Sequence, residues 1–220
     1  MRSMYNLLLK ELKLGVSPFF YVLPFLTGAL MLIPGWIYFI VILYFGFITI
    51  PNMFGGYKSQ NDLMFTGMLP VSKKDIVKAR ITFVVILEFL HLVIAIIYGF
   101  ITVRLYPDLD YIFFAPTFGF WGLCLVMLAV FNMIFFPMYY KTAYNYGAAT
   151  IVSVTSASLF AIAAEWLSIQ NPAVHELFKG NGADNLAVQL CILLIGFGIF
   201  AIFTIFAYHI ANKRFVKVEI

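Results

Sequence analysis

Two ionisable side chains, Glu88 and His91, lie three residues apart inside an apolar stretch of the sequence. Side chains at this spacing share one face of a helix, and a carboxyl and an imidazole that meet there can exchange a proton. Inserting an ionisable group in a membrane-spanning helix costs roughly 2.5–3.5 kcal/mol on insertion scales, so we expect the pair to have a structural or functional role. A step of about 100° per residue places further residues in the same narrow stripe. They are Arg80, Val84, Ala95, Tyr98 and Thr102.

This polar stripe has two interpretations. In the first it lines a substrate path, to which Glu88, His91, Tyr98 and, from the next apolar segment, Asn132 contribute. In the second, Glu88 and His91 form a structural pair that holds helices together, and Asn132 makes an interhelical hydrogen bond. A metal site is not expected, because no further His or Cys lies at ligand spacing.

The composition determines which elements would position these residues. The chain has 220 residues, of which 63% are apolar and 11% charged, whereas soluble domains average about 45–50% and about 25%. This excess of apolar residues predicts a polytopic membrane protein. No soluble basic face remains for nucleic acid. Cys124 and Cys191 lie in apolar runs and predict neither a disulfide nor a metal site.

Six segments are apolar and long enough to cross a bilayer as helices, which need about 20 residues each. Lipid offers no partner to backbone polar groups, and no segment alternates with the period of two that barrel strands require. We therefore expect an all-α fold with one transmembrane domain over residues 1–220. The expected spans are about 17–33, 36–54, 80–103, 112–138, 145–166 and 187–211.

The basic residues predict the orientation of these spans. If the N-terminus is cytoplasmic, twelve of the fourteen Lys and Arg residues fall on that side, and Arg104 and Lys179 fall outside. This excess follows the positive-inside rule. We therefore expect a multi-pass protein of the cell membrane with both termini in the cytoplasm. Glu165, at the outer end of the fifth span, is expected to be solvated.

Residues 1–15 carry too many charges to cross a bilayer and show helical periodicity instead. Apolar side chains recur on one face and polar ones on the other, which is typical of an amphipathic helix in the inner headgroup plane. Lys10, Glu11 and Lys13 interrupt the apolar run and argue against a cleavable signal peptide.

A face of small residues in the fifth span predicts close helix packing and is a candidate contact with a second copy of the chain. Its members are Gly147, Thr150, Ala157, Ala161 and Ala164. Pro24, Pro116 and Pro137 are candidate helix kinks.

The segment between the second and third spans reads "NDLMFTGMLPVSKKDIVKAR" and is the one place where charges cluster. Residues 58–67 predict one short helix that carries Leu63, Met64 and Phe65. Ser72 and, three residues later, Asp75 then form a capping-box-like start of the next helix. The three apolar side chains would be exposed on an otherwise polar loop, so they need a cover, either lipid or a cleft in another protein.

This segment resembles the permeases of the ABC-2 transporter family, in which a "-LP-S-+-+-IV-+-+" pattern follows the second of six spans. The whole plan of the chain is similar as well, from an amphipathic N-terminal elbow helix to a basic C-terminus. Among these permeases it most resembles those that export phenol-soluble modulins, which are small amphipathic peptides. Many relatives carry a Glu near Asp62, where this chain has "QND".

The resemblance implies that the short helix is a cytoplasmic coupling helix that docks a separate ABC ATPase. The residues implied in this contact are Lys58, Gln60, Asp62, Leu63, Met64, Phe65, Thr66, Leu69 and Pro70. The chain has no G-x-x-x-x-G-K-[ST] phosphate loop. We therefore expect no enzymatic activity and no cofactor in this chain, and ATP and Mg in the partner ATPase. A second permease copy or homologue and membrane lipid are the other expected partners.

The expected cargo is amphipathic peptides such as phenol-soluble modulins, and the alternatives within the family are lipid-like or drug cargo. A proton-coupled secondary transporter that uses Glu88 and His91 would predict inverted repeats with broken helices, and the two halves of the sequence do not show them. An integral membrane enzyme would need a metal-ligand set or a nucleophile beside a base, and the sequence has neither arrangement.

Overall fold

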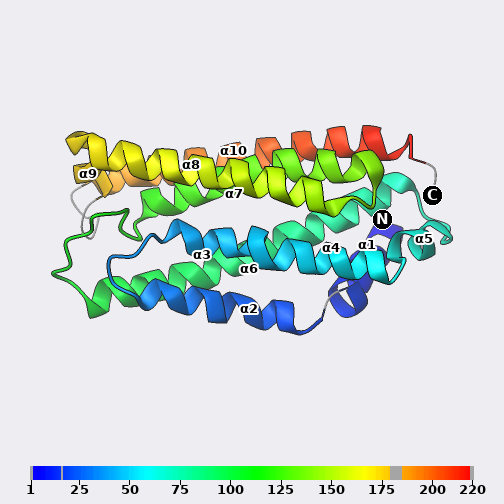
Figure 1. Cartoon of the computed structure of the whole chain (residues 1–220), viewed down its shortest axis with the longest axis horizontal. Coiled ribbons are helices and arrows are strands. Elements are labelled where there is room, and N and C mark those ends of the chain that lie inside the picture. The colour runs from blue at the N-terminus through cyan, green and yellow to red at the C-terminus, as the bar shows by residue number, and fades with distance from the viewer. Residues whose placement is uncertain (1, 16, 179–184, 219–220) are drawn as a thin grey trace.

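The computed structural model describes residues 2–15, 17–178 and 185–218, and the regular structure in these ranges is helical throughout. The long helices run side by side, with both termini and α5 at one end of the molecule and α9 at the other (Figure 1). We call these the terminal end and the far end. The elements are α1 (Arg2–Lys10), η1 (Glu11–Gly15), α2 (Phe19–Gly28), η2 (Ala29–Leu32), α3 (Phe39–Tyr44), η3 (Phe45–Thr49), α4 (Ile50–Ser59), α5 (Asp62–Gly67), α6 (Lys73–Leu105), α7 (Phe118–Thr142), α8 (Tyr146–Gln170), α9 (Pro172–Phe178) and α10 (Leu186–Phe215).

Within the described residues, five helices are long and apolar enough to cross a membrane. The first is the continuous rod Phe39–Ser59, in which α3, the π-helical η3 and α4 follow one another, and the others are α6, α7, α8 and α10. They match the second to sixth predicted spans. Helix α6 begins seven residues before the predicted 80, because it continues through polar turns that a search for apolar segments does not count.

The first predicted span, 17–33, is not among these five. In its place lies a shorter apolar helix, Phe19–Leu32, formed by α2 and η2. At a rise of about 1.5–2.0 Å per residue it is on the order of 22 Å long, whereas the hydrocarbon core is about 30 Å thick. The helix tightens to 3₁₀ geometry at Ala29 and ends before Pro34. The apolar residues were counted correctly, but they do not all belong to one helix.

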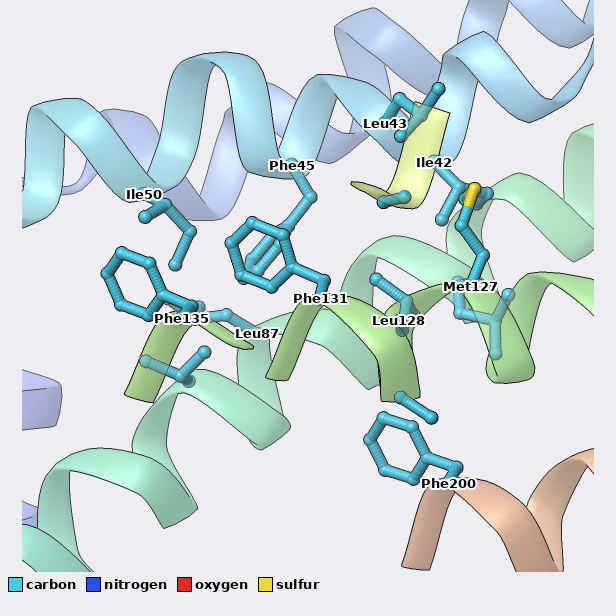
Figure 2. Close-up of a cluster of buried hydrophobic side chains, with 14 of the residues drawn as sticks. Ile42, Leu43, Phe45, Ile50, Leu87, Met127, Leu128, Phe131, Phe135 and Phe200 are labelled. Atoms are coloured by element: carbon cyan, nitrogen blue, oxygen red, sulfur yellow. The ribbon is translucent and has the colours of Figure 1, made fainter. Parts of the chain in front are cut away.

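The rod, α6, α7 and α10 enclose a core of large apolar side chains (Figure 2). In Figure 2, Phe45 and Ile50 from the rod face Phe131 and Phe135 from α7. The ring of Phe54 from the rod packs edge-on against that of Phe135, with centroids 4.9 Å apart and planes 76° apart. This packing fixes the rod against α7 and so determines the surroundings of the polar residues in α6.

Helices α7 and α10 are in backbone contact at two glycines. A Cβ atom on Gly196 would lie 2.3 Å from the carbonyl oxygen of Gly122, and one on Gly122 would lie 2.6 Å from that of Ile192. Only glycine allows this approach, which is how helices associate closely in membranes.

The small-residue face of α8 is used inside the chain. Thr150, Ala157 and Ala161 are buried, whereas Ile151 and Leu159 are exposed. Three of the five residues predicted as a candidate contact with a second copy are therefore covered by the chain's own helices. The prediction of close packing was correct, but its partner is intramolecular.

Candidate functional site

Helix α5 has one buried and one exposed face. Asp62 and Thr66, one helical turn apart, are buried, whereas Met64 and Phe65 are 56% and 61% exposed. Met68, directly after the helix, is 72% exposed. We call Met64, Phe65 and Met68 the apolar ridge.

Polar contacts fix the buried face of α5 to two other helices. Lys10, at the end of α1, donates a hydrogen bond from Nζ to Oγ1 of Thr66 at 2.7 Å and forms an ion pair with Asp62. Arg80 from α6 forms a second ion pair with Asp62 and lies 3.2 Å from Oε1 of Glu11. We call Lys10, Glu11, Asp62 and Arg80 the charge cluster.

An aromatic ring completes the charge cluster. The guanidinium carbon of Arg80 lies 4.0 Å from the ring centroid of Tyr57, in cation–π geometry. The Tyr57 hydroxyl donates a hydrogen bond to Oε2 of Glu11 at 2.5 Å. Arg80 is fully buried. Such a site suits Arg better than Lys, because the flat guanidinium can stack on a ring while it donates to carboxylates.

The charges of the cluster balance, with two cationic and two anionic side chains. A buried charge is tolerated when an opposite charge and hydrogen bonds compensate its lost hydration. Burial alone would raise the pKa of Asp62, but the Arg80 charge and the Lys10 hydrogen bond outweigh it and lower that pKa below its ordinary value. Asp62 is therefore ionised at neutral pH.

Helix α6 begins as the sequence predicts. The backbone N–H of Asp75 donates to Oγ of Ser72 at 3.1 Å, and the Ser72 hydroxyl donates to the Asp75 carboxylate at 2.8 Å. From this cap, 33 residues of helix lead to Leu105. Any displacement of α5 that is carried through Arg80 would reach α6 two turns from its start.

The other residues predicted to contact an ATPase lie around α5. Lys58, Gln60, Leu69 and Pro70 are exposed and Leu63 is half-buried. Two grooves flank the apolar ridge. One, of 350 Å³, lies between Met64 and Tyr144, two residues beyond the end of α7, and the other, of 370 Å³, lies between Phe65 and Leu7 of α1.

The polar residues inside the helical bundle do not pair as a Glu–His couple. Oε2 of Glu88 accepts a hydrogen bond from Nδ2 of Asn132 at 3.0 Å, and the same amide lies 3.3 Å from Oγ1 of Thr204. Nε2 of His91 lies 2.8 Å from the carbonyl oxygen of Val41. Each of the two thus bonds to a different helix. The predicted interhelical hydrogen bond of Asn132 is confirmed.

His91 contacts the rod where its helix changes form. The backbone N–H of Phe45 bonds to the carbonyl of Ile42, and the carbonyl of Val41 accepts from His91 instead. A carbonyl only accepts, so Nε2 carries the proton. Short π-helical segments such as η3 are frequent at functional sites. Glu88, His91 and Asn132 are all buried, and Tyr98 is half-buried.

Glu165 was expected to be solvated but is only 6% exposed. Its Oε2 accepts a hydrogen bond from the backbone N–H of Phe114 at 3.3 Å. It lies one turn beyond Ala161, on the buried face of α8 that also holds Ala157. The helical spacing from the small residues could have shown that this carboxyl faces inward. Among the described residues, no group of three or more His, Cys, Asp or Glu is placed to hold a metal ion.

Comparison with known proteins adds one match. The sequence model for the ABC-2 family transporter protein matches residues 6–215 of this chain. No curated protein and no solved structure gives a significant match.

Proposed function

The chain belongs to the ABC-2 transporter family as a transmembrane subunit of an ABC transporter, and on this basis we propose that α5 is the element on which the ATPase docks. Association with a cytoplasmic ABC ATPase follows from the family. The apolar ridge, flanked by its two grooves, would enter a cleft of that ATPase. The observation that carries the proposal is the division of α5 into an exposed apolar face and a buried face held by ion pairs.

The charge cluster supports the proposal because it makes α5 rigid with respect to the membrane helices. A docking element transmits movement only if it cannot rotate or slide on its own chain. Asp62 ties α5 to Arg80 of α6, and Thr66 ties it to Lys10 of α1. When the ATPases bind and hydrolyse ATP, with Mg held in their own sites, the resulting movement of α5 would shift α1 and α6 with it.

Helix α6 would carry this movement to the polar residues of the bundle. The hydrogen bonds of Glu88 to Asn132 and of His91 to Val41 hold α6 to α7 and to the rod. Packed helices shift between discrete arrangements rather than deform continuously. An exchange of these hydrogen bonds would accompany the opening of a substrate path lined by Glu88, His91, Tyr98 and Asn132. This is a conformational mechanism without covalent chemistry in this chain.

The assembly in this proposal has two permease subunits, identical or homologous, that enclose the path, and two ATPases on the cytoplasmic side. The basic residues support this orientation, since the terminal end carries Lys58, Lys73, Lys74, Lys78 and Lys213. The proposed direction is export, and the proposed cargo is amphipathic peptides such as phenol-soluble modulins, on the strength of the sequence resemblance. Lipid-like cargo is the alternative, and a groove lined by Glu165 is relevant to that alternative.

The proposal is tested by co-purification from the native membrane. Met64→Ser with Phe65→Ser removes the centre of the apolar ridge without disturbing the buried face of α5. The control is Val216→Ser, which changes an apolar side chain of similar exposure, 60%, at the same end. We expect an ABC ATPase, identified by mass spectrometry, to co-purify with wild type and control and to be lost from the double variant. Retention by the double variant, or absence of any ABC ATPase from the wild-type preparation, would overturn the proposal.

A further inference from the structure

A groove of 530 Å³ opens between the rod and α8. It involves the first half of the rod and the second half of α8, so it lies toward the far end of the molecule, away from α5. Ile40 and Phe47 form one wall, and Ile162 and Trp166 form the other. This surface suits a hydrocarbon chain, because apolar side chains dominate ligand sites for such molecules.

One lining residue, Glu165, carries a carboxyl group. Among the described residues that line the groove, Glu165 alone is ionisable as an acid or a base at physiological pH. One of its oxygens accepts the Phe114 N–H, and the other, Oε1, is buried without a hydrogen-bond partner among the described residues. A buried carboxyl with an unused oxygen is unfavourable until a donor compensates it. A cationic donor is the strongest compensation, since charge-assisted hydrogen bonds are about twice as strong as neutral ones.

The size of the groove restricts its ligand. A ten-residue α-helix with its side chains, about 15 Å long and 10 Å wide, occupies on the order of 1,200 Å³, so only part of its width would enter a groove of 530 Å³. A single alkyl chain fits. The combination of one carboxyl and a narrow apolar wall therefore matches an amphiphile with one hydrocarbon chain and an amine.

We propose that this groove binds a single-chain cationic amphiphile, with its alkyl chain between the rod and α8 and its ammonium group at Glu165. Only the role of this ligand as cargo rests on the proposed function, because binding itself does not require an ATPase. The groove would then select among membrane amphiphiles by charge, which an apolar surface alone cannot do.

Trp166 in the groove wall makes the proposal directly measurable. It is 64% exposed, whereas Trp36 is half-buried and Trp121 is buried. The permease alone, in phosphatidylcholine nanodiscs, would be titrated with 6-bromododecylamine or with 6-bromododecanol, whose bromine near the middle of the chain quenches the fluorescence of a tryptophan beside the carboxyl. We expect a saturable quench by the amine at a concentration at least about tenfold lower than by the alcohol, as one charge-assisted hydrogen bond predicts. Unbrominated dodecylamine should compete.

Two variants assign the site. Glu165→Gln should weaken binding of the amine by about tenfold and leave binding of the alcohol unchanged. Trp166→Phe should remove the saturable quench. If Glu165→Gln does not fold, Glu165→Asp, which keeps a carboxyl at this position, takes its place. The comparison of amine with alcohol binding in the wild type then still tests whether the groove prefers the amine. Equal quenching by both probes would mean that the groove holds only a lipid tail and would overturn the proposal, as would an unchanged amine affinity in Glu165→Gln. Either result leaves the docking role of α5 untouched, because no ATPase is present.

Discussion

Arg80 and Asp62 form a buried ion pair that joins the beginning of the membrane helix α6 to the short helix α5. They are eighteen positions apart in the chain, with a turn at Pro70 between them. The pair closes this loop so that α5 has a fixed position relative to the membrane helices. Lys10 and Glu11 extend the closure to the N-terminal helix.

The first prediction concerns the loss of Arg80. Arg80→Met removes the cation that two buried carboxylates share, and the loss of one partner from a buried ion pair typically destabilises by about 3–5 kcal/mol. We expect a corresponding decrease in the thermal unfolding temperature of the permease in nanodiscs. Lys58→Met removes an exposed cation nearby and should change stability little.

A double-variant cycle separates the ion pair from side-chain packing. Arg80→Met with Asp62→Asn leaves Lys10 beside Glu11, so the cluster is again close to neutral. The double variant should therefore be less destabilised than the sum of the two single variants. Additive losses, or an Arg80→Met effect no larger than that of Lys58→Met, would contradict the assignment of Arg80 as the centre of the cluster.

The second prediction concerns pH. The pKa of Asp62 is lower in the folded chain than its ordinary value of 3.8, so the carboxylate form stabilises the fold. This contribution is fully present above the ordinary pKa, decreases as the pH falls below 3.8, and is lost once the pH has passed the folded pKa. Thermal unfolding of wild type and Asp62→Asn between pH 6 and pH 3 should show the difference between them narrowing only at the acidic end. A constant difference would contradict the prediction.

The third prediction concerns the contact of α7 with α10. Gly196→Ala places a methyl group 2.3 Å from the Gly122 carbonyl oxygen, which is backbone and cannot rotate away. The helices must separate, and we expect a loss of about 1–3 kcal/mol, the usual effect of overpacking. Gly198→Ala is the matched control, since nothing lies within 4 Å of its added Cβ. It should be neutral or slightly stabilising, because Ala favours helix over Gly. Equal effects of the two substitutions would disprove the close contact.

Local features of this fold follow from the sequence, and the long-range ones do not. The Ser72 cap depends on residues three apart, so the pattern alone predicts it. The first predicted span is not confirmed as one membrane-crossing helix, because apolar composition does not reveal that the helix tightens at Ala29 and stops before Pro34. The charge cluster joins residues 18 to 69 positions apart, and nothing in their local sequence distinguishes them from solvated charges.

Each of the two candidate sites also combines features that the sequence predicts with features that it does not. The exposure of Met64 and Phe65 was expected from an apolar group in a polar loop, but the burial of Asp62 beneath them was not. Glu88 and His91 share a helix face as predicted, yet their hydrogen-bond partners come from Asn132 and Val41 on other helices. Only the packing of those helices, which depends on Gly122 and the aromatic core, decides which partner each side chain meets.

The last prediction concerns His91 and the rod. His91→Phe keeps a ring beside Phe45 but leaves the carbonyl of Val41 without its donor, and an unsatisfied buried carbonyl costs about 1–3 kcal/mol. The rod would respond by returning toward regular α-helix, in which that carbonyl accepts from its own chain, or by opening more often. Hydrogen–deuterium exchange over residues 41–49 should therefore change in His91→Phe and stay unchanged in Val93→Ala, an exposed position on the same helix. If exchange over this segment is the same in both variants, His91 is not what holds the π-helical turn of the rod.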